Sequence, residues 1–273
     1  MAANQPLTPV ELNEDAPSEN TNGQESYWRI RHTLILPTLL IAAGLIGLLF
    51  PASLRLFTWI AIFLLLLLSS LIVGHGTTDK WNGLLIDERN KISLARFQMM
   101  LWILIVLSAF LTAALINVRS NPLNALAINV PIELLALMGI STTSLVGAPL
   151  ALSTKRDQVM SNDTRYDARW SDMFMGEEVA NQGRLDVGKV QLFYFTIILA
   201  VAYIGALVVM FISTSNTINS FPSLNDGLVT LLGISHAGYL VNKAVPRVGN
   251  TNATDASNLV DETKTQNLPP VVS

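Results

Sequence analysis

The chain contains no cysteine and little charge, and both features narrow what it can be. Without cysteine, it has no disulfides, no thiolate metal ligands and no cysteine nucleophile. Charged residues make up only 14% of its 273 residues, whereas hydrophobic residues make up 51%. A water-soluble domain seldom has this balance, because its surface needs charge. The composition favours a protein that faces lipid, and the net charge of -3 lacks the basic excess of a nucleic-acid-binding protein.

Signatures of enzymes are also missing. The sequence has no HExxH, no GxSxG and no phosphate-binding GxxxxGK[ST] motif, and it has no cluster of His and carboxylate residues with metal-ligand spacing. His32 and His75 have no evident partner. We therefore predict that the protein is not an enzyme and that it has no catalytic residues, metal site or cofactor.

Six apolar stretches are long enough, with different margins, to cross a bilayer. About 20 apolar residues span roughly 30 Å of hydrocarbon as a helix. The stretches are residues 34–54, 56–74, 97–118, 130–152, 190–212 and 224–243. The fourth begins with Pro131 and Glu133, and the sixth is interrupted by Ser235-His236, so a re-entrant segment stays an alternative there. The prediction is an all-α, polytopic transmembrane helix bundle of about six spans.

The distribution of basic residues predicts the orientation, because Lys and Arg in short loops are retained on the cytoplasmic side. With the N-terminus inside, all 17 Lys and Arg residues except Arg55 and Arg119 lie on that side. We therefore expect both termini in the cytoplasm. A bacterial inner membrane is the predicted location, and an internal photosynthetic membrane is the alternative.

The chain also resembles itself. Residues 91–98 align without gaps to residues 184–191, and Trp81–Glu88 aligns with Trp170–Glu177. Further on, Leu137-Met-Gly-Ile-Ser141 matches Leu231-Leu-Gly-Ile-Ser235. This pattern predicts an internally duplicated two-helix hairpin. Because each copy holds an even number of spans, the copies should share one orientation about an axis along the membrane normal.

These patterns divide the chain into five predicted regions. They are a disordered N-terminal tail at 1–26, a transmembrane hairpin at 27–76, a first repeat at 77–152, a second repeat with a cytoplasmic loop at 153–246, and a disordered C-terminal tail at 247–273. The tails are assigned as disordered because they are polar and nearly free of aromatic residues.

Two pairs of residues are predicted to fix the start of the third and fifth spans. Ser93 and Asp186 should be N-caps, since their side-chain oxygens can accept the free amide protons of a first helical turn. Arg96 and Lys189, one turn further on, should extend along the helix towards the lipid headgroups.

Four polar residues near mid-helix are candidates for a solute pathway or for interhelical hydrogen bonds: Ser141, Thr142, Ser235 and His236. His236 is the ionisable residue that lies well inside a span, where an unpaired charge is costly. We interpret it as a hydrogen-bonding residue between helices, with a proton relay as the alternative.

Glu133 and Asp226 lie at the outer entrances of the fourth and sixth spans. Acids at a helix N-terminus are stabilised by the helix dipole, which is our interpretation. Alternatively, a ring of such acids in an oligomer would attract cations to a pore mouth.

The loop at 153–189 is the longest soluble segment between spans. Its Trp170, Met173 and Phe174 have helical spacing and predict a short amphipathic helix at the inner membrane interface. The alternative is that these residues form a docking surface for a cytoplasmic partner.

Three motifs resemble those of a group of uncharacterised bacterial membrane proteins. They are Gly233-Ile-Ser-His-Ala-Gly-Tyr-Leu240, Asp172-Met-Phe-Met-Gly-Glu-Glu178 and Asp186-Val-Gly-Lys-Val-Gln-Leu-Phe193, and the resemblance covers about residues 80–246. It implies a bacterial membrane protein and brings neither an activity nor catalytic residues.

Two functions follow as hypotheses. The favoured one is a non-enzymatic membrane anchor or scaffold that binds a cytoplasmic protein through the 153–189 loop. The alternative is a small channel or transporter with a pathway at the repeat interface. The predicted surroundings are the lipid bilayer and no nucleic acid, and a homo-oligomer stays open because small-residue faces also pack between copies.

Overall fold

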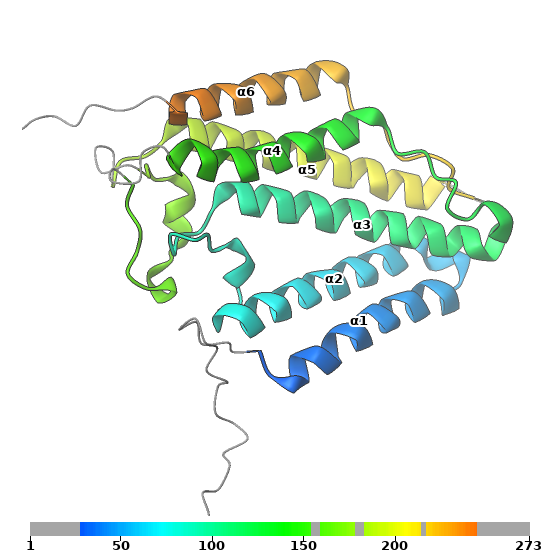
Figure 1. Cartoon of the computed structure of the whole chain (residues 1–273). Helices are drawn as coiled ribbons and strands as arrows, with labels where there is room; N and C mark the ends of the chain where they lie inside the picture. Colours follow the sequence, from blue (N-terminus) through cyan, green and yellow to red (C-terminus); the bar gives the residue numbers. More distant parts are fainter. Residues whose placement is uncertain (1–27, 154–158, 178–182, 214–216, 245–273) are drawn as a thin grey trace, which may run out of the picture. The chain divides into compact units, whose positions relative to one another are not determined.

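The computed structural model describes residues 28–153, 159–177, 183–213 and 217–244 (Figure 1). Most of these residues belong to six α-helices, and within these ranges the only β-structure is two isolated bridges. The helices are α1 (Ile30–Leu49), α2 (Arg55–Thr78), α3 (Leu94–Ser120), α4 (Ile132–Ser153), α5 (Val187–Ser213) and α6 (Asp226–Ala244). The predicted all-α fold is confirmed.

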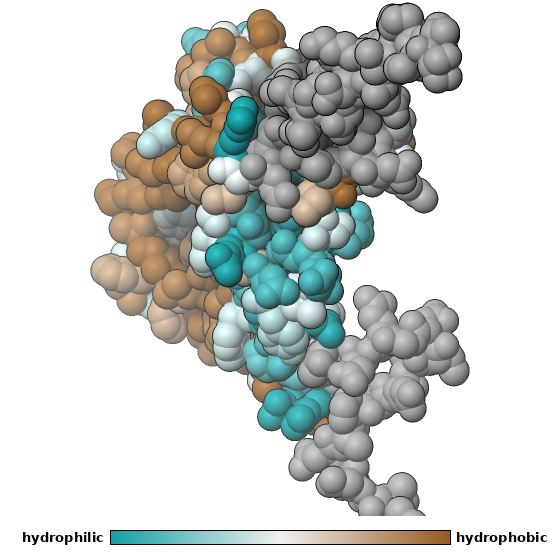
Figure 2. Space-filling model, turned by 90° about the vertical axis from the view of Figure 1, so that its left-hand side faces the viewer, coloured by the Kyte–Doolittle hydropathy of each residue, from teal (hydrophilic) through white to brown (hydrophobic). Residues whose placement is uncertain are grey.

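Five of these helices, α1 to α5, are long and apolar enough to cross a membrane. In α6 the apolar part, Asp226–Val241, is shorter, so the predicted sixth stretch is helical but falls short of that length. Hydrophobic side chains cover much of the surface in view (Figure 2), as a lipid-facing protein requires. The chain is a multi-pass integral membrane protein. The predicted tails at 1–26 and 247–273 lie outside the described residues.

The helices form two compact units, each built from segments that are distant in the sequence. The first unit combines the residues up to Asp87 with 100–130 and 202–222, and the second combines 88–99, 131–201 and the residues from Ser223 onward. The long helices α3 and α5 therefore contribute to both units.

Aromatic side chains form the core of the first unit. The Trp59 indole nitrogen donates a hydrogen bond of 3.0 Å to Ser108 Oγ, and the Trp59 ring stacks on Phe211 with 5.4 Å between ring centroids. The rings of Trp102 and Tyr203, both buried, meet edge to face at 6.1 Å. Such contacts bury large apolar surfaces and fix the angle between neighbouring rings.

The antiparallel hairpin of α1 and α2 places two histidines side by side. The rings of His32 and His75 have centroids 5.9 Å apart, and they lie between Trp28, 5.5 Å from His32, and Trp81, 4.7 Å from His75. The expectation that these histidines lack a partner is wrong, because the hairpin brings the start of α1 to the end of α2.

In the second unit, α4 packs against α6. A methyl group on Gly147 would lie 3.4 Å from Leu240 Cδ1, and one on Gly233 would lie 3.5 Å from Ile140 Cδ1. Residue 147 is thus paired with 240 and residue 140 with 233. The difference between the two residue numbers, the offset, is the same in both contacts, so the two helices run parallel. The alignment of 91–98 with 184–191 has this offset too. The internal duplication itself stays a prediction.

The predicted N-caps are confirmed. Asp186 Oδ1 accepts hydrogen bonds from the backbone N–H groups of Gly188 at 3.0 Å and Lys189 at 3.4 Å, and α5 begins at the next residue. Ser93 Oγ accepts a longer bond of 3.5 Å from the N–H of Arg96 at the start of α3.

Candidate functional site

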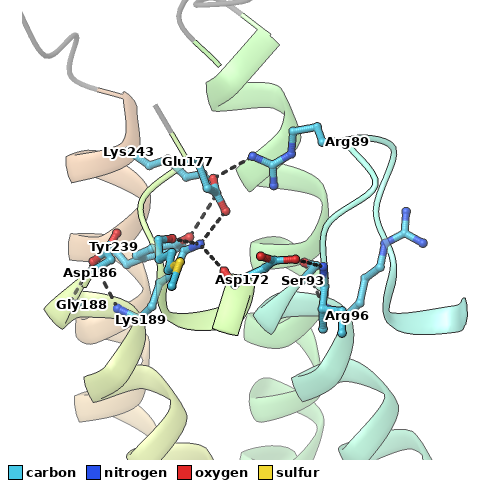
Figure 3. A network of polar contacts seen from close by, with 12 residues as sticks. Arg89, Ser93, Arg96, Asp172, Glu177, Asp186, Gly188, Lys189, Tyr239 and Lys243 are labelled. Carbon is cyan, nitrogen blue, oxygen red and sulfur yellow. Dashed lines mark hydrogen bonds and ion pairs between the residues drawn. The ribbon is translucent and has the colours of Figure 1, made fainter. Parts of the chain in front are cut away.

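A cluster of charged side chains surrounds Glu177 in the second unit (Figure 3). Its carboxylate lies 3.1 Å from Arg89 Nη1 and 2.9 Å from Lys189 Nζ, and it also pairs with Lys243 Nζ. We call these four residues the Glu177 cluster. One carboxylate thus serves three cations that are far apart in the sequence.

Each member of the Glu177 cluster comes from a different element. Arg89 precedes α3, Lys189 lies in the first turn of α5, and Lys243 lies in the last turn of α6. Glu177 belongs to the connection between α4 and α5 and is largely buried, with 12% of its side chain exposed. The ion pairs therefore fasten this connection to three helix ends at once.

The position of Lys189 corrects the sequence interpretation. This lysine was expected to extend towards the lipid headgroups, but only 3% of the residue is exposed. Its ammonium group donates a 2.8 Å hydrogen bond to the carbonyl of Met175 besides pairing with Glu177. The prediction is wrong because a buried carboxylate and a carbonyl replace the headgroups as partners. Arg96, by contrast, pairs with Glu88 at 3.4 Å near the surface.

The charges in the cluster hold Glu177 in its ionised form. Burial alone would raise the pKa of this carboxyl group, but the positive charges of Lys243, Lys189 and Arg89 hold its pKa well below the usual range. Both carboxylate oxygens contact cations, which favours a structural task over proton transfer. Lys243 Nζ also donates a 3.0 Å hydrogen bond to the hydroxyl group of Tyr239.

Residues 159–177, within the connection between α4 and α5, are fixed at further points as well. Asn162 and Asn90 exchange hydrogen bonds of 2.8 and 3.0 Å between their side-chain amides and backbone carbonyls. Asp172 Oδ2 accepts a bond of 2.8 Å from the N–H of Arg169 and a longer one of 3.4 Å from the N–H of Ile92. The segment is therefore tied to the chain just before α3 as well as to α5 and α6.

The three predicted interface residues of this segment take different positions. Trp170 to Phe174 form a short 3₁₀ helix. Trp170 is 55% exposed, whereas Met173 is buried. The ring of the half-buried Phe174 meets Phe193 edge to face at 5.1 Å. The outward face of residues 159–177 thus carries Trp170, next to the exposed Arg169.

Ser141 and Thr142, two of the four candidate pathway residues, lie on different faces of α4. Ser141 is buried, whereas Thr142 is exposed. Each hydroxyl group donates to a carbonyl one turn earlier in its own helix, at 3.2 Å to Leu137 and 2.9 Å to Met138. Local bonds of this kind satisfy both hydroxyl groups without a solute.

Ser235 and His236 also have separate surroundings. Ser235 Oγ accepts a 3.1 Å hydrogen bond from Gln191 Nε2, which links α6 to α5. His236 is buried, and its Nδ1 lies 3.0 Å from the carbonyl oxygen of Leu232. Among the residues that the structure describes, no hydrogen bond joins two of the four candidates, and His236 Nε2 and the buried Ser144 Oγ have no hydrogen-bond partner.

Glu133 and Asp226 both lie in the first turn of a helix, α4 and α6 respectively. Glu133 is half-buried and Asp226 is exposed. These positions agree with acids at helix N-termini, and the alternative role at a pore mouth stays a prediction.

Sequence reasoning missed Glu177, Arg89 and Lys243 as site residues. The alignment of the copies contained a signal, because it pairs Glu88 with Glu177 and Arg96 with Lys189. Each predicted copy then holds an ion pair between aligned positions. The pair of Glu88 and Arg96 is the more exposed one, and the pair of Glu177 and Lys189 is buried. In the described parts of the chain, no group of three or more His, Cys, Asp or Glu residues could hold a metal ion.

No protein-family model matches the chain, and neither a curated protein nor a solved structure matches it. The resemblance of its motifs to uncharacterised bacterial membrane proteins stays a prediction.

Proposed function

We propose that the protein is a non-enzymatic membrane anchor or scaffold whose docking segment, residues 159–177, binds a partner protein from the aqueous phase. One observation carries the proposal: the segment is held by the buried ion pairs of Glu177 while Trp170 remains 55% exposed. A connection that only joined two helices would not need this fastening.

The fastening matters because ordering a flexible loop weakens binding. Fixing a rotamer-rich side chain at an interface costs about 0.5–1.5 kcal/mol, and a segment that is already fixed avoids much of this cost. Hydrogen bonds from Asn90, Ile92 and Lys189 hold the docking segment in advance. A partner would therefore meet a surface whose shape is already set.

The exposed residue types also suit a protein interface. Tryptophan and arginine are enriched among the residues that dominate binding energy, and Trp170 and Arg169 are adjacent on this segment. The exposed acids Asp163 and Asp167 add polar groups around them, as is typical of the rim of an interface. The partner that fits is a soluble protein with an apolar pocket bordered by charged groups.

The test is a crosslinked pull-down of the tagged full chain from its native membrane in mild detergent, with mass spectrometry of the recovered proteins. We expect a stoichiometric soluble partner whose affinity falls about 30-fold in a Trp170→Ala variant, because loss of a dominant interface residue costs about 2 kcal/mol or more.

Trp81→Ala is the matched control, since Trp81 is 60% exposed but lies outside the docking segment. Equal loss in both variants would mean that exposed tryptophans bind lipid or detergent without specificity. Recovery of the chain alone would contradict the proposal.

A channel or transporter is the second candidate, and a different observation favours it. His236 Nε2 and Ser144 Oγ are buried without a hydrogen-bond partner within the described residues, and they belong to α6 and α4, which pack together. A buried polar atom without a partner is costly, and water or a solute between these helices would satisfy it.

Flux into proteoliposomes distinguishes the two candidates. For an anchor, we expect the purified protein to give no ion flux above that of empty liposomes. For a transporter, His236→Ala should lower the flux about tenfold or more, whereas Thr143→Ala, which changes an exposed hydroxyl group, should not. Flux that is unchanged in the His236 variant would remove the titratable residue on which the transporter hypothesis depends.

A further inference from the structure

A cavity of about 180 Å³ lies in the first unit, where α1 ends, α2 begins and α3 ends. Two arginines, Arg55 and Arg119, line it together with the hydroxyl-bearing Thr58 and Ser120. The remaining described lining residues, Gly47, Phe50, Pro51 and Ile116, are apolar or small. None of the described lining residues is acidic, so the charge that faces the cavity is positive.

The two arginines are held differently. Arg55 begins α2 and is only 5% exposed, so its guanidinium group is presented by a buried side chain. Arg119, in the last turn of α3, is exposed and donates a hydrogen bond to the carbonyl of Phe50. Of the two lining arginines, one is therefore buried and the other is accessible from solvent. These are also the two basic residues that the sequence analysis placed on the outer side of the membrane.

The size of the cavity limits what it can hold. Pockets for drug-sized ligands measure about 300–1,000 Å³, so a cavity of about 180 Å³ fits a small group. Guanidinium groups match the geometry of phosphate through paired hydrogen bonds. The hydroxyl group of Ser120 donates to the carbonyl of Ile116 at 3.2 Å. The Ser120 oxygen can still accept a hydrogen bond, but the donors to a phosphate group have to come from the arginines.

The surroundings of the cavity are apolar. Leu49 and Leu54, on either side of the turn between α1 and α2, are exposed, and α1 as a whole leaves most of its apolar side chains exposed. A phospholipid whose phosphate group occupied the cavity would have apolar surface beside it for its acyl chains. A free phosphate ion would use the arginines alone.

We propose that this cavity is a phosphate-binding site formed by Arg55 and Arg119. The phosphate group belongs either to a phospholipid headgroup or to inorganic phosphate. This site shares no residue with the docking segment, and it goes beyond the anchor function. It would bind a lipid or a soluble anion at the turn between α1 and α2.

The experiment uses the purified full chain in detergent. Native mass spectrometry measures binding of dioleoylphosphatidylglycerol, with phosphate-free dioleoylglycerol as the lipid control, and calorimetry measures binding of inorganic phosphate. The variants are Arg119→Gln and Ser120→Glu, because both residues are exposed and their replacement leaves the buried Arg55 in place. Arg184→Gln is the matched control, since Arg184 is an exposed arginine that does not line the cavity.

We expect the protein to bind one phosphatidylglycerol in preference to dioleoylglycerol. Arg119→Gln should weaken this binding at least about tenfold, because it removes charge-assisted hydrogen bonds, and Ser120→Glu should weaken it further by repulsion. Arg184→Gln should bind like the wild type. Binding of inorganic phosphate with the same dependence on the variants, and no lipid preference, would support the site with a soluble ligand. Binding of neither ligand, or equal binding in all variants, would overturn the proposal.

Discussion

Replacing Glu177 by glutamine is expected to lower the unfolding free energy by about 3–5 kcal/mol, the usual cost of removing one partner from a buried ion pair. The glutamine side chain has nearly the same size but no charge, so Arg89, Lys189 and Lys243 would remain close together without a counter-charge. Unfolding of the purified protein in detergent, followed by its intrinsic tryptophan fluorescence during heating or denaturant titration, measures the loss.

Glu88→Gln is the matched control for this variant. Glu88 pairs with Arg96 at 3.4 Å, but 76% of its side chain is exposed, and an exposed pair contributes only about 0–1 kcal/mol. We expect the Glu88 variant to unfold almost like the wild type. If the two variants lost the same amount of stability, the Glu177 cluster would not hold the unit together.

The pH dependence gives a second measurement of the same ion pairs. Because the pKa of Glu177 is lower in the folded protein than its usual value, its contribution to stability is fully present above the unfolded-state pKa of about 4.3. It is lost as the pH falls towards the folded-state pKa. The difference between the wild type and Glu177→Gln should therefore stay constant above about pH 5 and shrink below about pH 4.

A third variant identifies the cause of the instability. In the Glu177→Gln background, Lys243→Met removes one of the three cations, so repulsion in the cluster should fall. We expect this double variant to regain part of the lost stability. A further loss instead would mean that Lys243 stabilises the fold by packing or by its bond to Tyr239 more than through its charge.

The helices could be predicted because a membrane span is a long apolar stretch whatever its neighbours are. Their ends could not be placed as well. The first span was expected from residue 34, but α1 already begins at Ile30, where polar residues such as His32 continue the helix. The buried His32 lies against aromatic rings and accepts a hydrogen bond from the N–H of Arg29. A search for apolar stretches alone does not detect these contacts.

The Glu177 cluster could be predicted only in part. Alignment of the two predicted copies relates Glu177 to Glu88 and Lys189 to Arg96. Glu88 pairs with Arg96, and Glu177 pairs with Lys189. The sequence does not show that one pair is buried and the other exposed. The buried pair also involves Lys243, which the packing of α6 brings to Glu177.

The candidate pathway residues show a related limit. Successive residues of an α-helix point about 100° apart, because one turn takes 3.6 residues. Ser141 and Thr142 therefore cannot face the same neighbour, and only the packing of α4 decides that Ser141 is buried and Thr142 exposed. A list of polar residues near mid-helix identifies candidates without telling which of them meet.

Replacing Asn117, in the last turn of α3, by leucine should destabilise the first unit. The buried Asn117 side chain accepts a hydrogen bond from the N–H of Ile218 and donates one to the carbonyl of Ile218, both at 2.8 Å. Leucine has the same number of side-chain heavy atoms but makes neither bond, and each buried backbone group left without a partner costs about 1–3 kcal/mol. We expect faster hydrogen–deuterium exchange in residues 217–222 and a lower unfolding free energy.

Asn121→Leu is the control for this prediction, because Asn121 follows the same helix but is exposed. Its exchange in residues 217–222 should match that of the wild type. Asn117→Asp should be destabilising as well, because a buried carboxylate cannot donate to the carbonyl of Ile218 and carries a charge that is costly to bury. Unchanged exchange in the Asn117→Leu variant would show that residues 217–222 are held by other contacts, such as the bond from the N–H of Phe221 to the carbonyl of Asn129.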